Sequence, residues 1–201
     1  DKLGREFYEM CQKSNPDFLM VGEGCYDLQS QYYGTYTRAD YWHEPVLRYI
    51  DPTVPIACAV IDHNDLNHVN MCLADRYAMS YEVRNFKGHL GEFPRVMAYG
   101  RKVDNLRRRY ADFLWNGEFL DVLGATVKGD NIRYTVFRNL KNGKKAVVVY
   151  NVDTKKANTA SVSIDGSSAP LVMASPEKPA PAKFTGSVTL GPQSAVVIME
   201  K

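Results

Sequence analysis

The sequence predicts an α/β segment followed by an all-β segment, because the spacing of its apolar residues changes along the chain. In the first part, apolar runs typical of buried strands alternate with stretches of helical periodicity. From Val122 onward the apolar residues recur at a period of two, and turn sequences interrupt them often. We therefore expect two domains, residues 1–119 and residues 120–201, with the boundary near residues 119–121.

The bulk composition excludes several classes of protein. The 201 residues suffice for one large domain or two small ones, and 45% of them are hydrophobic, which is enough to bury a core. The net charge of +2 is too close to zero to suggest a nucleic-acid-binding protein. No apolar run approaches the ~20 residues that a membrane-spanning helix needs. We expect neither a nucleic-acid partner nor a membrane partner.

The first segment is expected to contain parallel strands separated by helices. A helix stops at Ser14-Asn15-Pro16, Asp65 can cap a second helix, and a third has its apolar face between Val96 and Leu114. Strands that are apolar on both faces and alternate with helices indicate a parallel sheet covered on both sides. The expected strands are residues 17–22, 54–62 and 78–83.

The second segment is expected to be an antiparallel β-sandwich. Asn142-Gly143 lies between two apolar stretches, which is a strong hairpin signal, and the proline-rich residues 175–183 favour a loop. Many short strands with frequent turns are typical of a sandwich. The seven expected strands are residues 122–127, 131–138, 144–150, 159–164, 169–174, 183–189 and 194–199.

The order of these elements resembles the C-terminal part of a bacterial glycoside hydrolase. The resemblance implies the last strands and helices of a (β/α)8 (TIM) barrel followed by a C-terminal β-sandwich. Such a barrel has roughly five further strands upstream, so we expect this chain to be a fragment that is inactive without the rest of the barrel. The stretches that carry the resemblance are NPDFLMVGEGCYD, EPVLRYIDP, YGRKVDNLRRRYADFLWNGEFLDVLGA and KKAVVVYNVD.

Glu23 is the candidate catalytic residue. It follows the first apolar strand and stands between Gly22 and Gly24. Counted back from the last helix, that strand is the sixth of the barrel. The resemblance implies a general acid/base at the carboxyl end of this strand. It also implies that the nucleophile lies on strand four, which is upstream of this sequence. Glycoside cleavage requires two such carboxyl groups. The alternative is a tight turn with a solvated glutamate at its tip.

Other polar and aromatic residues near the expected strand ends are candidates for substrate binding. Asp62 and Glu82 lie near the ends of the other two strands. Together with Asp27 they are candidates for the second carboxylate. If the nucleophile lies upstream, Asp62 and Glu82 would bind sugar hydroxyls or orient other groups, whereas Asp27 binds substrate or forms a turn. Tyr32, Tyr33 and Trp42 belong to a tyrosine-rich loop expected over residues 26–49, and their rings could stack on a sugar or pack the loop onto the barrel.

Two further candidates carry nitrogen groups. Arg48 would pair with a carboxylate at the barrel mouth or be solvated, and His63 would bind a hydroxyl. The segment DHNDLNH, residues 62–68, has the composition of a metal site, but its two histidines are five residues apart and would not share a helical face. We therefore expect no metal and no other cofactor.

The sequence thus predicts part of an enzyme that hydrolyses glycosidic bonds, with a carbohydrate as substrate. The alternative is a non-catalytic, carbohydrate-binding or structural fragment of a larger glycan-processing protein. The sugar, its linkage and the stereochemical outcome stay open at this point. The compartment stays open as well, although glycan-degrading proteins of this kind are often exported, which favours a secreted or periplasmic location.

Overall fold

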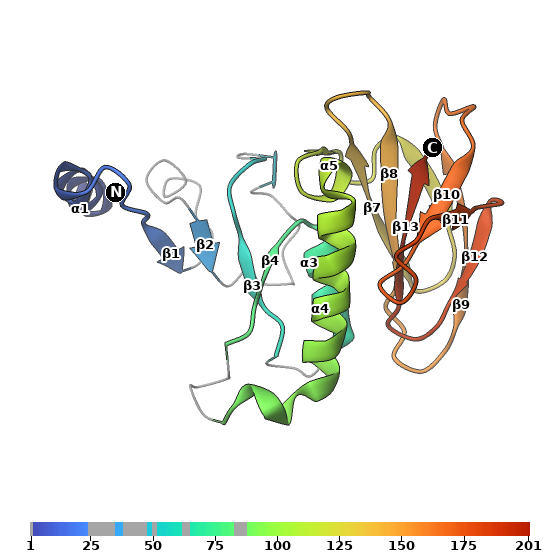
Figure 1. The fold of residues 1–201 in the computed structure, drawn as a ribbon, viewed down its shortest axis with the longest axis horizontal. Helices are drawn as coiled ribbons and strands as arrows, with labels where there is room; N and C mark the ends of the chain where they lie inside the picture. The colour runs from blue at the N-terminus through green and yellow to red at the C-terminus, as the bar shows by residue number, and fades with distance from the viewer. Residues whose placement is uncertain (1, 24–34, 38–47, 50–51, 62–64, 83–87) are drawn as a thin grey trace.

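The computed structural model describes residues 2–23, 35–37, 48–49, 52–61, 65–82 and 88–201. Within these residues, an α/β part with parallel strand pairs precedes an antiparallel β-sandwich, which is the fold class that the sequence predicts. Figure 1 shows helix α4 (Pro94–Arg109) between the strands of the α/β part and the sandwich. The N-terminal helix α1 (Lys2–Ser14) lies at the end of the molecule far from the sandwich.

The described residues of the α/β part form two parallel strand pairs. Strand β1 (Val21–Glu23) pairs with β2 (Thr35–Thr37), and β3 (Ala57–Ala59) pairs with β4 (Ala78–Ser80). β1, β3 and β4 correspond to the three predicted strands, although each is shorter than predicted. The expectation that residues 26–49 form a loop throughout is wrong at β2. The sequence Thr-Tyr-Thr favours a strand, but three residues are too few for a recognisable period.

Helix α3 (Leu66–Ala74) joins β3 to β4 and begins where the sequence predicts. The carboxylate of Asp65 accepts a hydrogen bond of 2.8 Å from the backbone amide of Asn67, so Asp65 is the N-cap. Leu66, Val69 and Leu73, which recur at helical spacing, are buried. The helix is therefore fixed at its first turn by a cap and along its length by apolar packing.

The predicted third helix forms as α4 followed by the short helix α5 (Ala111–Leu114), with a break at Tyr110. Val96, Val103 and Leu106 are completely buried, as their spacing predicts. Among the described residues, no helix is both long enough and apolar enough to cross a bilayer.

The sandwich consists of nine antiparallel strands in two sheets. The larger sheet has the order β11-β10-β13-β8-β7-β5 and the smaller one the order β12-β9-β6. The sheet thus begins at Glu118, while the division of the chain into residues 1–119 and 120–201 stays a prediction. The strands are β5 (Glu118–Phe119), β6 (Ala125–Lys128), β7 (Ile132–Arg138), β8 (Lys145–Asn151), β9 (Asn158–Ile164), β10 (Leu171–Ala174), β11 (Ala182–Lys183), β12 (Ser187–Leu190) and β13 (Ala195–Glu200).

The predicted strand at residues 183–189 is split between the two sheets. β11 pairs with β10 in the larger sheet, whereas β12 pairs with β9 in the smaller one. Gly186 lies between them with φ +97°, a conformation that residues with a side chain rarely adopt. The chain therefore crosses from one sheet to the other at this glycine.

Both faces of the larger sheet are buried. Val147 and Val149 of β8 belong to the core between the two sheets. Val148 and Tyr150, which point to the opposite face, pack in the core that also contains residues of α3 and α4. This double burial explains why β8 is continuously apolar although antiparallel strands usually alternate.

The apolar stripe of α1 is largely exposed. The structure forms the predicted helix, but Leu3, Phe7 and Met10 are 78%, 45% and 57% exposed. Phe7 makes an edge contact with Phe18, with the ring centroids 6.5 Å apart. An amphipathic helix normally buries such a stripe against a core.

Asn151 is a buried polar residue whose replacement should destabilise the sandwich. Its amide nitrogen donates to the carbonyls of Lys156 (2.8 Å) and Gly191 (3.0 Å), and its oxygen accepts from the amides of Asp153 (2.9 Å) and Asn158 (3.0 Å). Because Asn151→Ala leaves these buried groups without a partner, we expect it to lower the free energy of unfolding by about 3 kcal/mol. Urea unfolding of the full-length protein measures this change.

Asn142→Ala is the matched control, because the exposed Asn142 side chain accepts a single hydrogen bond, from the amide of Lys144. We expect this variant to lose less than ~0.5 kcal/mol, as is usual for surface substitutions. Equal losses in the two variants would contradict the role given to Asn151.

Tyr150 should make the folded protein less stable at alkaline pH. Burial raises the pKa of Tyr150 to about 12, whereas a tyrosine in an unfolded chain titrates near 10. Between these values the folded state holds more protons than the unfolded state, so this contribution is complete below pH 10 and is lost as the pH rises to 12. We expect Tyr150→Phe to flatten the fall in unfolding free energy between pH 10 and 12, measured by urea unfolding. An unchanged slope would show that Tyr150 does not titrate this way.

Candidate active site at the strand ends

The carboxyl ends of the parallel strands define the candidate site. In each pair the strands run in register, so that Glu23 at the end of β1 lies beside Thr37 at the end of β2. In the other pair, Ala59 near the end of β3 lies beside Ser80 at the end of β4. Catalytic groups of βα-folds gather at such ends, because the loops that follow the strands converge there.

The structure describes only part of the residues that the sequence predicts for this site. Glu23 is the last residue of β1. Its backbone is described, but its side chain is not. Glu82 follows β4 by two residues and is half-buried. Six further candidates lie outside the described residues, namely Asp27, Tyr32, Tyr33, Trp42, Asp62 and His63.

Asp65 is the last residue of the connection from β3 to α3. One of its carboxylate oxygens accepts both the amide of Asn67 and the side-chain amide of Gln193, which lies in the sandwich. The interpretation of Asp65 as a helix cap is therefore confirmed.

His68, from the same segment, is buried in α3 and 2% exposed. Within the described ranges, no three His, Cys, Asp or Glu side chains converge as metal ligands would.

Tyr81, which precedes Glu82 in the sequence, packs against α4. A Cβ atom added at Gly100 would collide with the hydroxyl of Tyr81, so the Tyr81 side chain lies against α4 at this glycine. Burial, and secondarily the charge of Asp104, raise the pKa of Tyr81. A pocket of about 420 Å³ lies between β4 and α4 and is lined in part by Tyr81, Asp104 and Arg107.

Arg48 does not lie at the carboxyl ends. Its guanidinium donates to the carbonyls of Asp75 (3.0 Å) and Arg76 (2.7 Å), just before β4, and to that of Val54, just before β3. The side chain is 2% exposed and lies 5.5 Å from the centre of the Tyr77 ring. Arg48 is therefore not solvated, which corrects that interpretation, while its role in substrate binding stays a prediction. It holds the two strands together at their amino ends.

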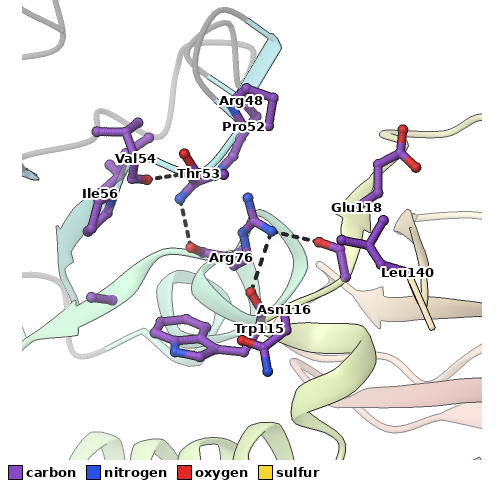
Figure 2. A pocket seen from close by; sticks show the side chains of 13 residues that line it. Arg48, Pro52, Thr53, Val54, Ile56, Arg76, Trp115, Asn116, Glu118 and Leu140 are labelled. Atoms are coloured by element: carbon purple, nitrogen blue, oxygen red, sulfur yellow. Dashed lines mark hydrogen bonds between the residues drawn. The ribbon is translucent and has the colours of Figure 1, made fainter. Parts of the chain in front are cut away.

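A second pocket, of about 520 Å³, lies at these amino ends (Figure 2). Figure 2 shows Arg76 donating to the carbonyls of Trp115 and Gly117, at 3.5 and 2.7 Å. Apolar side chains such as Val54 and Leu140 line the remainder. Its position, opposite to the carboxyl ends, separates it from the candidate site.

Arg107 of α4 is a second buried arginine. It belongs to a basic run of the helix, but its side chain is only 3% exposed. Its guanidinium donates to the carbonyls of Tyr77 (2.8 Å) and Cys72, and lies 4.6 Å from the centre of the Trp115 ring. Its spacing of four residues from the buried Val103 was the available signal.

Comparisons with known proteins identify the fold. No family model matches the chain, and no curated protein matches its sequence. A noncanonic maltogenic α-amylase from Thermotoga neapolitana superposes with a TM-score of 0.64 at 9% identity, over 97% of this chain and 58% of that one. Amy13B from Eubacterium rectale gives 0.51 at 12% identity, over 94% and 54%.

This chain has the fold of the C-terminal part of a glycoside hydrolase. It spans little more than half the length of these two proteins. The correspondence confirms the predicted fold class, in which an α/β part at the end of a barrel precedes a β-sandwich. At identities of 9% and 12%, the likeness concerns the fold alone.

Arg48→Lys distinguishes a structural arginine from one that binds substrate. A lysine cannot donate to three carbonyls in the fixed geometry of a guanidinium, so we expect the free energy of unfolding to fall by about 2–3 kcal/mol. Urea unfolding of the full-length protein measures the loss. The exposed Arg101 provides the control, and Arg101→Lys should leave stability within ~0.5 kcal/mol of wild type. If the Arg48→Lys protein is as stable as wild type and has lost only substrate affinity, Arg48 is a substrate-binding residue and not a structural one.

Proposed function

We propose that this chain is part of a glycoside hydrolase in which Glu23 is the general acid/base. The observation that carries the proposal is the position of the Glu23 backbone at the carboxyl end of a parallel strand, in a fold shared with glycoside hydrolases. A glycosidase acid must protonate the leaving oxygen, and a second carboxylate must attack the sugar or activate water. Glu23 has the chemistry for the first role.

The presence of β2 changes the strand count that underlies this assignment. Counted back from β4 through β3 and β2, β1 is the fourth strand from the end of the parallel series. In an eight-stranded barrel Glu23 would then belong to strand five, not strand six. The second carboxylate would come from the upstream part of the barrel, and Asp62 and Glu82 would bind sugar hydroxyls.

The exposed stripe of α1 supports the proposal that the active protein is larger than this chain. Leu3, Phe7 and Met10 form an apolar face that a complete barrel would bury between neighbouring helices. The partners proposed for the chain are accordingly a carbohydrate substrate and the upstream part of its own barrel. A chain produced without that part would have no complete cleft and no hydrolytic activity.

Glu23→Gln in the full-length protein tests the proposal. We expect kcat on natural glycosides to fall by about 10²–10⁴-fold, because glutamine cannot donate the proton that the leaving oxygen needs. Aryl glycosides with a readily expelled phenolate should be cleaved with a much smaller loss, since their leaving group needs little protonation. Steady-state kinetics on a panel of glycosides provide both measurements.

Glu177→Gln is a control, because this half-exposed carboxylate lies in the sandwich and pairs with Lys102 of α4. It should hydrolyse at the wild-type rate. If Glu23→Gln does the same, Glu23 is not the acid. Sugar binding without hydrolysis by the wild-type protein would instead favour the non-catalytic, carbohydrate-binding alternative.

A further inference from the structure

Cys58 and Cys72 place two thiols in contact inside the α/β part. The chain has four cysteines, and the structure describes three of them, all as free thiols. Cys58 lies in β3 and is 3% exposed, whereas Cys72 lies in α3 and is completely buried. A hydrogen bond joins their side chains, so the two sulfur atoms face each other between the strand and the helix. Side chains that point toward one another meet the directional requirement for a disulfide bond.

Backbone contacts hold the two cysteines in this arrangement. The carbonyl of Cys72 accepts from the amide of Tyr77 (2.9 Å), which directly precedes β4, and from the guanidinium of Arg107. In β4, Met79 lies opposite Cys58 in the parallel pairing with β3. The last turn of α3 is thereby held against the strand pair, and both cysteines belong to the same buried core. The native fold itself therefore brings the two thiols together.

We propose that Cys58 and Cys72 are a modification site, at which a disulfide bond forms when the chain folds in the presence of a small-molecule disulfide such as oxidised glutathione. The thiolate of one cysteine attacks the glutathione disulfide and releases one glutathione thiolate. The thiolate of the other cysteine then attacks the mixed disulfide and releases the second. Two electrons and two protons thus pass from the two cysteine thiols to two molecules of reduced glutathione.

The bond must form before the core closes. Burial raises the pKa of the Cys72 thiol, and the hydrogen bond with Cys58 raises it further. Since the thiolate is the reactive form, the folded protein holds Cys72 in a form that scarcely reacts. While the chain folds, both sulfur atoms are still accessible to glutathione. Once the bond has formed, the same burial protects it from attack by other thiols.

Refolding of the full-length protein tests the proposal. The reduced, unfolded protein is refolded either with a mixture of oxidised and reduced glutathione or with dithiothreitol, and free thiols are then alkylated. Cleavage before each aspartate puts Cys58 in residues 51–61 and Cys72 in residues 65–74, so mass spectrometry finds the two peptides joined only where the bond has formed. We expect joined peptides after refolding with glutathione, and separate alkylated peptides after refolding with dithiothreitol.

The disulfide should also stabilise the folded state. It closes a loop of about 15 residues and so restricts the unfolded chain, and we expect the equilibrium constant for unfolding to be about a hundredfold smaller than in the reduced protein. Urea unfolding of the two forms measures this ratio. A bond that strained the native structure would give no such gain.

Cys58→Ala removes one partner of the bond, and Cys11→Ala is the matched control. Cys11 is a half-buried thiol of α1, away from β3 and α3. Each variant is compared with its own reduced form, so that the effect of the lost side chain on folding cancels. We expect the stabilisation by glutathione to disappear in Cys58→Ala and to persist in Cys11→Ala.

Each outcome of these experiments decides the proposal. Joined peptides, together with a stabilisation that depends on Cys58, support it. Free thiols at both positions after refolding with glutathione, a bond from either cysteine to a different partner, or a joined protein no more stable than the reduced one overturns it. Because none of these measurements involves hydrolysis, their result is independent of whether Glu23 is the general acid/base.

Discussion

The burial of both faces of the larger sandwich sheet is the constraint on which the remaining structure depends. Alternate residues of β8 pack against the smaller sheet and against α3 and α4, as Val147 and Val148 illustrate. Each fully buried valine contributes roughly 1.5–3 kcal/mol relative to an exposed one. The sandwich and the two helices therefore share one continuous core, and separating them would expose the inner face of β8 and β13 to water.

That shared core lets the sandwich determine the geometry of the parallel strands. At their amino ends, β3 and β4 are joined by Arg48, whose guanidinium spans the carbonyls that precede both strands. At the other end, Gln193 reaches from the sandwich to Asp65 and Arg95. The strands are thus joined at their amino ends, and the first turns of α3 and α4 are joined to the sandwich, by polar contacts that apolar packing alone would not orient.

Much of the architecture could be predicted from the sequence, because it follows from local patterns. The buried hairpin of β7 and β8, the cap at Asp65 and the stripe of α4 each depend on a few neighbouring residues. β2 could not be predicted, since three residues carry too little periodicity. The split at Gly186 depends on which sheet each half joins, and that is a long-range choice which local propensity does not encode.

The candidate site could be predicted only in part. The sequence places Glu23 at a strand end, and the structure agrees for its backbone, but the strand number depends on β2. Arg48 and Arg107 are held by backbone carbonyls that lie far from them in the sequence, and such acceptors leave no local pattern. Gln193 gives no local signal in the sequence, since its partners lie in the other part of the chain.

Three arginines, the buried Arg48 and Arg107 and the half-buried Arg76, determine how the α/β part responds to acid. Arg48, Arg76 and Arg107 donate to backbone carbonyls, which neither gain nor lose a proton in the range where proteins fold. A guanidinium also keeps its charge throughout that range. Acidification that neutralises carboxylates at the surface leaves these hydrogen bonds to backbone carbonyls intact. A fall in pH should consequently weaken ion pairs at the surface before it weakens these internal hydrogen bonds.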